Sequence, residues 1–132
     1  MKLSSKTHYG LMASIMLGKV YPDGTISASE LEKGIGVSGK YLEKIMRLLG
    51  SRSIVSANRG ANGGYYLLKD PKDITVGEIV RALEDDMKII ECVDKNGTCK
   101  CCPSQRVWKK LYTGINDVLD SMTLSQVLNG EL

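Results

Sequence analysis

Phenylalanine is absent from this sequence of 132 residues, and tryptophan and histidine occur once each. Leucine, isoleucine, methionine and valine must therefore supply the hydrophobic core. No apolar run approaches the roughly 18 residues that a membrane-spanning helix needs, so we do not expect a membrane protein. The first ten residues include Lys2 and Lys6 but no apolar block followed by a cleavage site. We therefore expect no signal peptide and a cytoplasmic location.

Internal repeats and low-complexity tracts are also missing. The hydrophobic fraction of 42% and the charged fraction of 25% are ordinary for a globular chain, and the length suits one domain with a small appendage. The sequence has no phosphate-binding glycine loop and no recognisable acid–base pair, so we do not expect an enzyme. A metal or thiol enzyme, with a cysteine nucleophile and His8 as base, is an alternative that only the residue types support.

Positive charge is concentrated in the first half of the chain. Residues 1–69 contain ten Lys/Arg and four Asp/Glu, a net charge of +6, whereas residues 70–132 contain eight and eleven, a net charge of −3. A basic half beside an acidic half is typical of a module that binds a polyanion and is joined to a second function. Chance clustering of surface charge is the alternative.

Two predicted helices and the turn between them show the pattern of a helix-turn-helix. Ser27 and Glu30 form a capping box for a short helix that ends near Lys33. Residues 34–37 form a tight turn in which glycine can adopt a positive φ. Ser38 then begins a second helix with an inward apolar stripe, which consists of Leu42, Ile45, Met46 and Leu49. An ordinary helix pair is the alternative interpretation.

A β-hairpin is predicted directly after this motif. Residues 54–58 and 65–68 read as strands on either side of a glycine-rich tip, residues 59–64. This order predicts the wing of a winged helix. Arg59 at the tip suits insertion into a narrow minor groove, and glycines such as Gly60 remove bulk from that approach. A solvated loop arginine is the alternative.

Helices are also predicted over residues 5–20, after Ser4 or Ser5 as the cap, and over residues 74–84 and 104–121, with a short one from Thr123 to Leu128. The helix at 104–121 carries an apolar seam with spacings of three and four, made by Trp108, Leu111, Ile115, Val118 and Met122. The seam favours pairing with a second copy, and packing on its own domain is the alternative.

The predicted fold is therefore mainly α with a small β-hairpin. We expect a winged helix-turn-helix domain over residues 1–84, a cysteine-rich loop over residues 85–103, and a dimerisation helix with a short terminal helix over residues 104–132. A homodimer of this kind would present two DNA-reading helices to a near-palindrome, with half-sites one or two helical turns apart.

The outward side of the second helix of the motif supplies the predicted DNA contacts. Ser38 and the first-turn amides suit a phosphate. Lys40 and Lys44 can neutralise phosphates or donate to guanine. Glu43 either accepts from a cytosine amino group or pairs with a cation one turn later. The whole set is Ser38, Lys40, Tyr41, Glu43, Lys44 and Arg47, with Arg59 and Gly60 from the wing.

Four cysteines lie within eleven residues, namely Cys92, Cys99, Cys101 and Cys102. In a cytoplasmic chain such a cluster indicates a metal or redox site, and the spacing lacks the C-x2-C pairs of a zinc ribbon. Neighbouring side chains diverge, so we expect three working cysteines, with one taken from the adjacent pair. A fourth ligand stays open between His8, Glu91, Asp94, Gln105, a small molecule and water.

The chain resembles the IscR/NsrR/CymR family of winged-helix regulators. The resemblance rests on residues 1–11, 37–43, 59–65 and 74–79, and on the cysteine loop followed by Trp108 and the closing Thr123-Leu124. It implies a homodimer with crossing C-terminal helices that binds palindromic promoter DNA, and we expect a repressor. Cluster-binding members hold a 2Fe–2S or 4Fe–4S centre through three loop cysteines, and the centre controls DNA affinity. Members without the cysteines respond by other routes, including protein partners.

The resemblance also implies which residues bind the cluster. The three family cysteines correspond to Cys92, Cys99 and Cys102, with Cys101 as an extra cysteine and the alternative to Cys102. Some members have a histidine ligand where this chain has Gln105, and others use the position of His8, given by the partner subunit. We expect a 2Fe–2S rather than a 4Fe–4S centre. Control by zinc or by thiol oxidation is the alternative.

Overall fold

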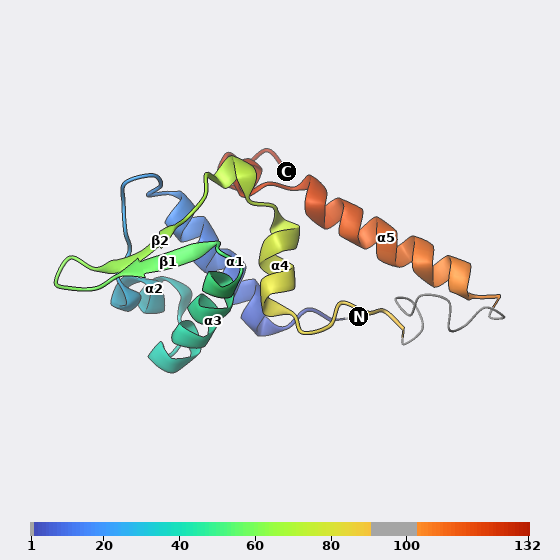
Figure 1. The fold of residues 1–132 in the computed structure, drawn as a ribbon, viewed down its shortest axis with the longest axis horizontal. Coiled ribbons are helices and arrows are strands. Elements are labelled where there is room, and N and C mark those ends of the chain that lie inside the picture. Colours follow the sequence, from blue (N-terminus) through green and yellow to red (C-terminus); the bar gives the residue numbers. More distant parts are fainter. Residues whose placement is uncertain (1, 91–102) are drawn as a thin grey trace.

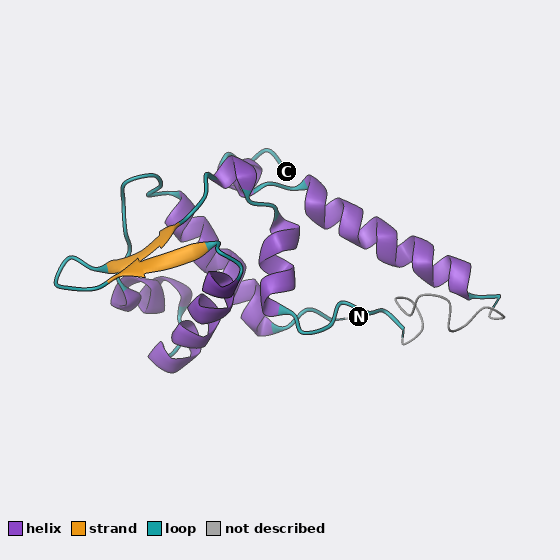
Figure 2. Cartoon of the chain, in the orientation of Figure 1, coloured by secondary structure: helices purple, strands orange, loops and turns teal. Residues whose placement is uncertain are grey.

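Helices dominate the computed structural model, which describes residues 2–90 and 103–132 (Figure 1; Figure 2). The predicted mainly α fold with one small hairpin and a long C-terminal helix is confirmed. In chain order the elements are α1 (Ser5–Gly18), α2 (Ala28–Ile35), α3 (Gly39–Ser51), β1 (Val55–Asn58), β2 (Gly64–Leu67), the 3₁₀ turn η1 (Pro71–Asp73), α4 (Val76–Leu83), α5 (Gln105–Ser121) and α6 (Leu124–Leu128).

The predicted helix starts are confirmed at the N-caps, where a hydroxyl oxygen accepts a hydrogen bond from the backbone N–H three residues later. The residues that do this are Ser4, Ser27, Ser38, Thr75 and Thr123. Two helix ends differ from expectation. Helix α1 ends at Gly18 rather than near residue 20, and α2 continues to Ile35. The α2 helix ends later because Gly36, with a φ of 83°, closes it, whereas Gly34 stays helical.

One hydrophobic core contains residues from the helices α1, α2, α3, α4 and α6 and from both strands of the hairpin. Leucine, isoleucine, valine and methionine supply most of it, as the absence of phenylalanine predicts. Gly10 lets α1 approach α4 closely, because a Cβ at this position would overlap with the Leu83 side chain. Leu124 of α6 is fully buried in the same core, so the chain returns to this body after α5.

Helix α5 projects from the body instead of packing into it (Figure 1). None of its residues is buried in the single chain, and Leu111 and Val118 of the predicted seam are 46% and 59% exposed. The apolar residues that form or cover the core include none from α5. The seam therefore does not fold back onto its own domain in the described chain. No helix among the described residues has the length and apolar character to cross a membrane.

Candidate nucleic-acid interface

The turn between α2 and α3 has the geometry of a helix-turn-helix. Gly36 adopts the left-handed conformation, and its N–H donates to the Glu32 carbonyl oxygen at 2.7 Å. The N–H of Val37 donates to the same oxygen at 3.3 Å. The two bonds close α2, and Ser38 begins α3 two residues after the glycine. The predicted motif is confirmed.

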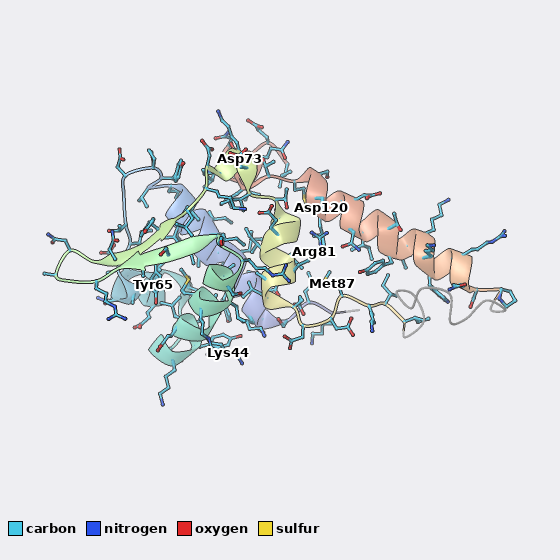
Figure 3. All side chains as sticks on the ribbon, viewed as in Figure 1. Lys44, Tyr65, Asp73, Arg81, Met87 and Asp120 are labelled. Atoms are coloured by element: carbon cyan, nitrogen blue, oxygen red, sulfur yellow. The ribbon has the colours of Figure 1, made fainter. Side chains whose placement is uncertain are left out.

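Helix α3 has one fully buried side and one exposed side. The predicted inward stripe is confirmed, since no member is more than 2% exposed: Leu42, Ile45, Met46 and Leu49. The opposite side carries exposed polar residues, Lys40, Glu43, Lys44 and Arg47. Lys44 lies at the lower edge of the molecule in Figure 3, away from α5. Three cations on an exposed helix face, anchored by a buried stripe, are what a DNA-reading helix requires.

Tyr41 differs from the outward orientation predicted for it. Its ring is half-buried and meets the Tyr9 ring of α1 edge-on, with 5.9 Å between the ring centroids at 84°. Tyr41 faces inward because the gap between α1 and the start of α3 accommodates an aromatic pair of favourable geometry. The predicted outward orientation of Tyr41 is therefore wrong, because its ring packs against Tyr9. A DNA contact through the Tyr41 hydroxyl stays a prediction.

Two roles are predicted for Glu43, and the structure bears only on the ion pair along α3. Within the described residues Glu43 makes no ion pair with Arg47, although the two are one turn apart. Burial, and after it the negative charge of Glu43, raises the pKa of the Tyr65 phenol on the wing. The carboxylate of Glu43 is thus exposed and close enough to influence the wing. Its contact with a base stays a prediction.

Ser38 combines the capping role with an exposed position at the start of α3. Its Oγ accepts a hydrogen bond from the Tyr41 N–H at 3.3 Å. The hydroxyl hydrogen remains available to donate to a phosphate oxygen at the positive end of the helix dipole. The phosphate contact itself stays a prediction.

The predicted wing is present as an antiparallel hairpin. The strands pair from Val55 opposite Leu67 to Asn58 opposite Gly64. Arg59 is exposed in the connecting loop, next to Gly60, which has a φ of 113°. The Gly63 N–H donates to the Gly60 carbonyl oxygen at 2.9 Å and closes the loop. The loop therefore presents an arginine with little side-chain bulk beside it.

A short backbone bridge fixes the wing to the helix-turn-helix. The Tyr65 N–H donates to the Ile26 carbonyl oxygen at 2.8 Å, and the Ile26 N–H donates back to Tyr65 at 3.0 Å. Ile26 directly precedes Ser27, the cap of α2. Gly64 permits this approach, because a Cβ there would crowd the Ile26 backbone. The position of the wing relative to α2 and α3 is thus set by hydrogen bonds that the sequence did not indicate.

Glu84 connects the end of α4 to the start of α1, and local sequence patterns did not indicate it. Its Oε1 accepts hydrogen bonds from the Ser4 N–H at 2.7 Å, the Ser4 hydroxyl at 3.0 Å and the Thr7 hydroxyl at 2.6 Å. Burial alone would raise the pKa of the Glu84 carboxyl, but the hydrogen bonds from Thr7 and Ser4 outweigh it, and the pKa is lowered.

His8 lies in the first turn of α1, next to the Thr7 that binds Glu84. Its side chain is exposed, and its ring centroid is 5.4 Å from that of Tyr9. Glu84 is the last residue before the predicted cysteine loop at 85–103, so the fold brings His8 near the base of that loop. An exposed imidazole here is accessible to a ligand from the same or a second chain.

The predicted cluster ligands Cys92, Cys99, Cys101 and Cys102 lie outside the described residues, as do Glu91 and Asp94. Gln105 is the first residue of α5 and is partly exposed. Among residues 2–90 and 103–132, no three His, Asp or Glu side chains gather in a way that could hold a metal ion. The assignment of individual ligands stays a prediction.

Comparison with known proteins identifies close similarity to bacterial regulators over nearly the whole chain. Residues 3–130 match the model of the Rrf2 family, whose description is iron-dependent transcriptional regulator. The transcriptional regulator CymR of Bacillus subtilis is 33% identical over 127 residues, which cover 96% of this chain and 89% of CymR. The regulator IscR of Yersinia enterocolitica is 29% identical over 134 residues, which cover 99% and 81%.

A solved structure extends the similarity to the fold. The structure of T. potens IscR superposes with a TM-score of 0.80 at 34% identity and covers 100% of this chain and 89% of its own. The relatives bear names of transcriptional regulators and not of enzymes. These similarities agree with the winged-helix geometry described above and with the exposed basic side of α3.

Proposed function

Because this chain belongs to the Rrf2 family of transcriptional regulators, we propose that it binds palindromic promoter DNA as a homodimer under the control of an iron–sulfur cluster. The DNA-binding function rests above all on α3, which is buried on one side and carries exposed cations on the other, next to the wing. Repression is the expected effect on transcription, and such a regulator acts in the cytoplasm, where the promoter is.

In this proposal, α3 and the wing bind different grooves of the DNA. The side chains of Lys40, Lys44 and Arg47 enter the major groove or meet its phosphates. Arg59 enters the adjacent minor groove, where a narrow groove concentrates negative potential. The bridge between Ile26 and Tyr65 supports simultaneous binding, because it holds the wing at a fixed position beside α3.

The apolar side of α5 supports dimerisation. It forms an open groove without a partner in the single chain, lined by Val107, Leu111, Gly114, Ile115, Val118 and Leu119, with Lys110 at its margin. Removing such a face from water is strongly favourable, and a second copy of α5 offers the same apolar spacing. Two-fold pairing would present two α3 helices to a near-palindrome.

The proposed donor set suits an iron–sulfur centre. Cys92, Cys99 and one of Cys101 and Cys102 would provide three thiolates, which are soft ligands that such clusters prefer. His8, from the partner subunit, is the proposed fourth ligand, and its exposed position near the base of the cysteine loop supports this. When bound, the cluster would supply a centre sensitive to iron and redox conditions. A ligand on α1 would couple it to Tyr41 and thus to α3.

Control by cysteine oxidation or by zinc is the second candidate, and two observations favour it. Cys101 and Cys102 are adjacent, which leaves one thiol without a place among three cluster ligands. A solved structure of the related Staphylococcus aureus CymR, 32% identical to this chain, is of an oxidized form. In this variant the DNA-binding surface is unchanged, and a change in thiol state replaces the cluster as the signal.

Duplex binding is tested with Arg59→Ala and the control Lys72→Ala. Both variants lose one exposed cation, but Lys72 lies in η1, next to Asp73 on the upper edge in Figure 3, opposite Lys44. With the best duplex that the wild-type protein selects from a random library, Arg59→Ala should weaken binding about 10-fold and Lys72→Ala hardly at all. Equal affinities of wild type and Arg59→Ala at several salt concentrations would remove the wing from the mechanism.

The cluster is tested by anaerobic purification with absorption spectroscopy and with iron and sulfide analysis. We expect a brown protein with iron and sulfide, and a change in affinity for the selected duplex when the centre is removed. A colourless protein whose DNA binding responds to thiol oxidation would support the second candidate instead. His8→Ala should alter the cluster absorption, and unchanged absorption together with unchanged DNA affinity would exclude His8 as a ligand.

A further inference from the structure

Helix α5 joins the body near its C-terminal end, through backbone hydrogen bonds. The Val76 N–H donates to the Met122 carbonyl oxygen and the Leu124 N–H donates to Ile74, both at 2.8 Å. In the described chain, α5 contributes no residue to the hydrophobic core. The core therefore does not determine the direction in which α5 leaves the body, and another contact must.

Arg81 of α4 makes that contact. Its Nη1 donates to Asp120 Oδ1 at 2.7 Å and its Nη2 donates to Asp120 Oδ2 at 2.9 Å. Nη2 also donates to Asn116 Oδ1 at 2.9 Å. Figure 3 shows Arg81 and Asp120 next to each other where α5 meets α4. A planar guanidinium bound through two parallel hydrogen bonds fixes direction as well as distance. We call Arg81, Asn116 and Asp120 the α4–α5 clamp.

The surroundings of the clamp are shaped to receive it. Gly77 leaves room on α4, because a Cβ there would overlap with Asp120 Oδ1. The Asn116 Nδ2 donates to the Tyr112 carbonyl oxygen one turn earlier at 2.9 Å, which turns the Asn116 oxygen toward Arg81. The hydrogen bond to Asp120 raises the pKa of Arg81, and the same bond lowers the pKa of Asp120. Both partners are therefore charged at neutral pH.

Stability is not the main effect of this pair. The side chains of Arg81 and Asp120 are 32% and 49% exposed. Exposed ion pairs contribute little to folding because water screens them and because ordering two side chains opposes the gain. A three-residue arrangement that makes three hydrogen bonds yet stays in contact with solvent is better suited to orient two helices than to hold the fold together.

We propose that the α4–α5 clamp sets the separation of the two α3 helices in the dimer, and thereby the spacing of DNA half-sites that the protein accepts. This inference rests on the proposed function, in which α5 pairs two copies. Helix α5 has 17 residues, about 25 Å in length. Rotation by about 10° at its junction with the body moves the far end by about 4 Å, close to the rise of one base pair. Arg81 is thus a positioning residue that never touches DNA.

The test compares Asp120→Asn with Asp117→Asn, a matched control on the same helix. Asp117 is exposed and is not part of the clamp. The probes are the best duplex that the wild-type protein selects from a random library and two versions with the half-sites one base pair closer or further apart. Wild type and Asp117→Asn should prefer the selected spacing by about 10-fold or more, and Asp120→Asn by about 3-fold or less. Sedimentation should show that all three proteins are dimers.

Arg81→Lys provides a second variant, because lysine keeps the charge but loses the two parallel bonds. Arg81→Lys should lose the spacing preference as Asp120→Asn does. Because the positive charge is retained, this loss would show that the preference depends on the geometry of the hydrogen bonds and not on the charge. If Asp120→Asn or Arg81→Lys is a dimer and keeps the spacing preference of the wild type, the proposed role of the clamp is wrong. If the wild-type protein selects no sequence from the library, the proposed function fails. Selective wild-type binding with unchanged spacing preference in the variants overturns this inference alone.

Discussion

Glu84 joins two segments that are 80 positions apart in the chain. It accepts hydrogen bonds from Ser4 and Thr7 at the start of the helix that carries His8, and it is the last residue before the predicted cysteine loop. Thr7 is 4% exposed, so its hydroxyl depends on this partner. One carboxylate therefore links the end of α4 to the start of α1.

Glu84→Gln should destabilise the protein by about 1 kcal/mol at neutral pH, because the three donors lose a charged acceptor that is partly exposed to water. The lowered pKa means that this stabilisation is present above the ordinary pKa of glutamate and is lost as the pH falls through the lower pKa of the folded state. Urea unfolding at about pH 7 and about pH 3.5 measures the difference, which should shrink at the acid pH.

Asp85→Asn is the control for this measurement, since Asp85 is an exposed carboxylate at the next position. It should change the free energy of unfolding little at either pH. A Glu84→Gln variant as stable as the wild type at neutral pH would show that the contacts with Ser4 and Thr7 contribute nothing to the fold.

At the scale of elements, the turn from α2 to α3 depends on a single backbone conformation. Gly36 has a φ of 83°, and a Cβ at this position would have nothing within 4 Å. Any cost of a side chain here therefore arises from the backbone and not from a clash. The adjacent α3 is the helix that we propose reads DNA, so the conformation of this turn matters for binding as well as for stability.

Gly36→Ala should destabilise the protein by about 1 kcal/mol, the cost of placing an L-residue in the left-handed region. Gly50→Ala, inside α3, is the matched control. A Cβ there would lie 3.6 Å from the Val55 carbonyl oxygen, an ordinary contact, and alanine is the better helix former. The urea midpoint should fall for Gly36→Ala and stay equal or rise for Gly50→Ala. A midpoint that moves in the same direction in both variants would contradict the assigned role of Gly36.

At the scale of the whole molecule, the apolar side of α5 is exposed in the described part of the single chain. Leu111 and Val118 are 46% and 59% exposed, whereas the leucine and isoleucine residues of the core are at most 8% exposed. An exposed apolar helix side of this kind is typical of a surface that binds another molecule. In the proposed dimer, two DNA-binding bodies would act at once, which would strengthen binding through effective concentration.

The double variant Leu111→Glu with Val118→Glu should be a monomer, because pairing of α5 would remove four carboxylates from water. Its affinity for a duplex with two half-sites should fall about 10-fold or more. Thr113→Glu, at an exposed polar position of the same helix, should stay dimeric. Analytical ultracentrifugation distinguishes the two outcomes, and a dimeric double variant would show that the subunits associate through another surface.

In α3, the features that depend on the helix alone were predictable from the sequence, and those that depend on other elements were not. The buried stripe from Leu42 to Leu49, the Ser38 cap and the exposed Lys44 all follow from a period and a cap contained within a few turns. The inward position of Tyr41 does not follow, because it depends on Tyr9 in another helix. The effect of the Glu43 charge on the Tyr65 phenol of the wing does not follow either, since Tyr65 lies 22 positions further along the chain.

The sequence by itself determined the α-helices and β-strands of this protein and their order, since helix caps, periodic apolar positions and turn glycines act over a few residues. Tertiary structure alone decided how the elements are joined. The contacts of Glu84 with Ser4, of Tyr65 with Ile26 and of Arg81 with Asp120 connect residues 39 to 80 positions apart. Such pairs leave no local pattern, because the folded chain, and not the spacing along it, brings their polar groups together.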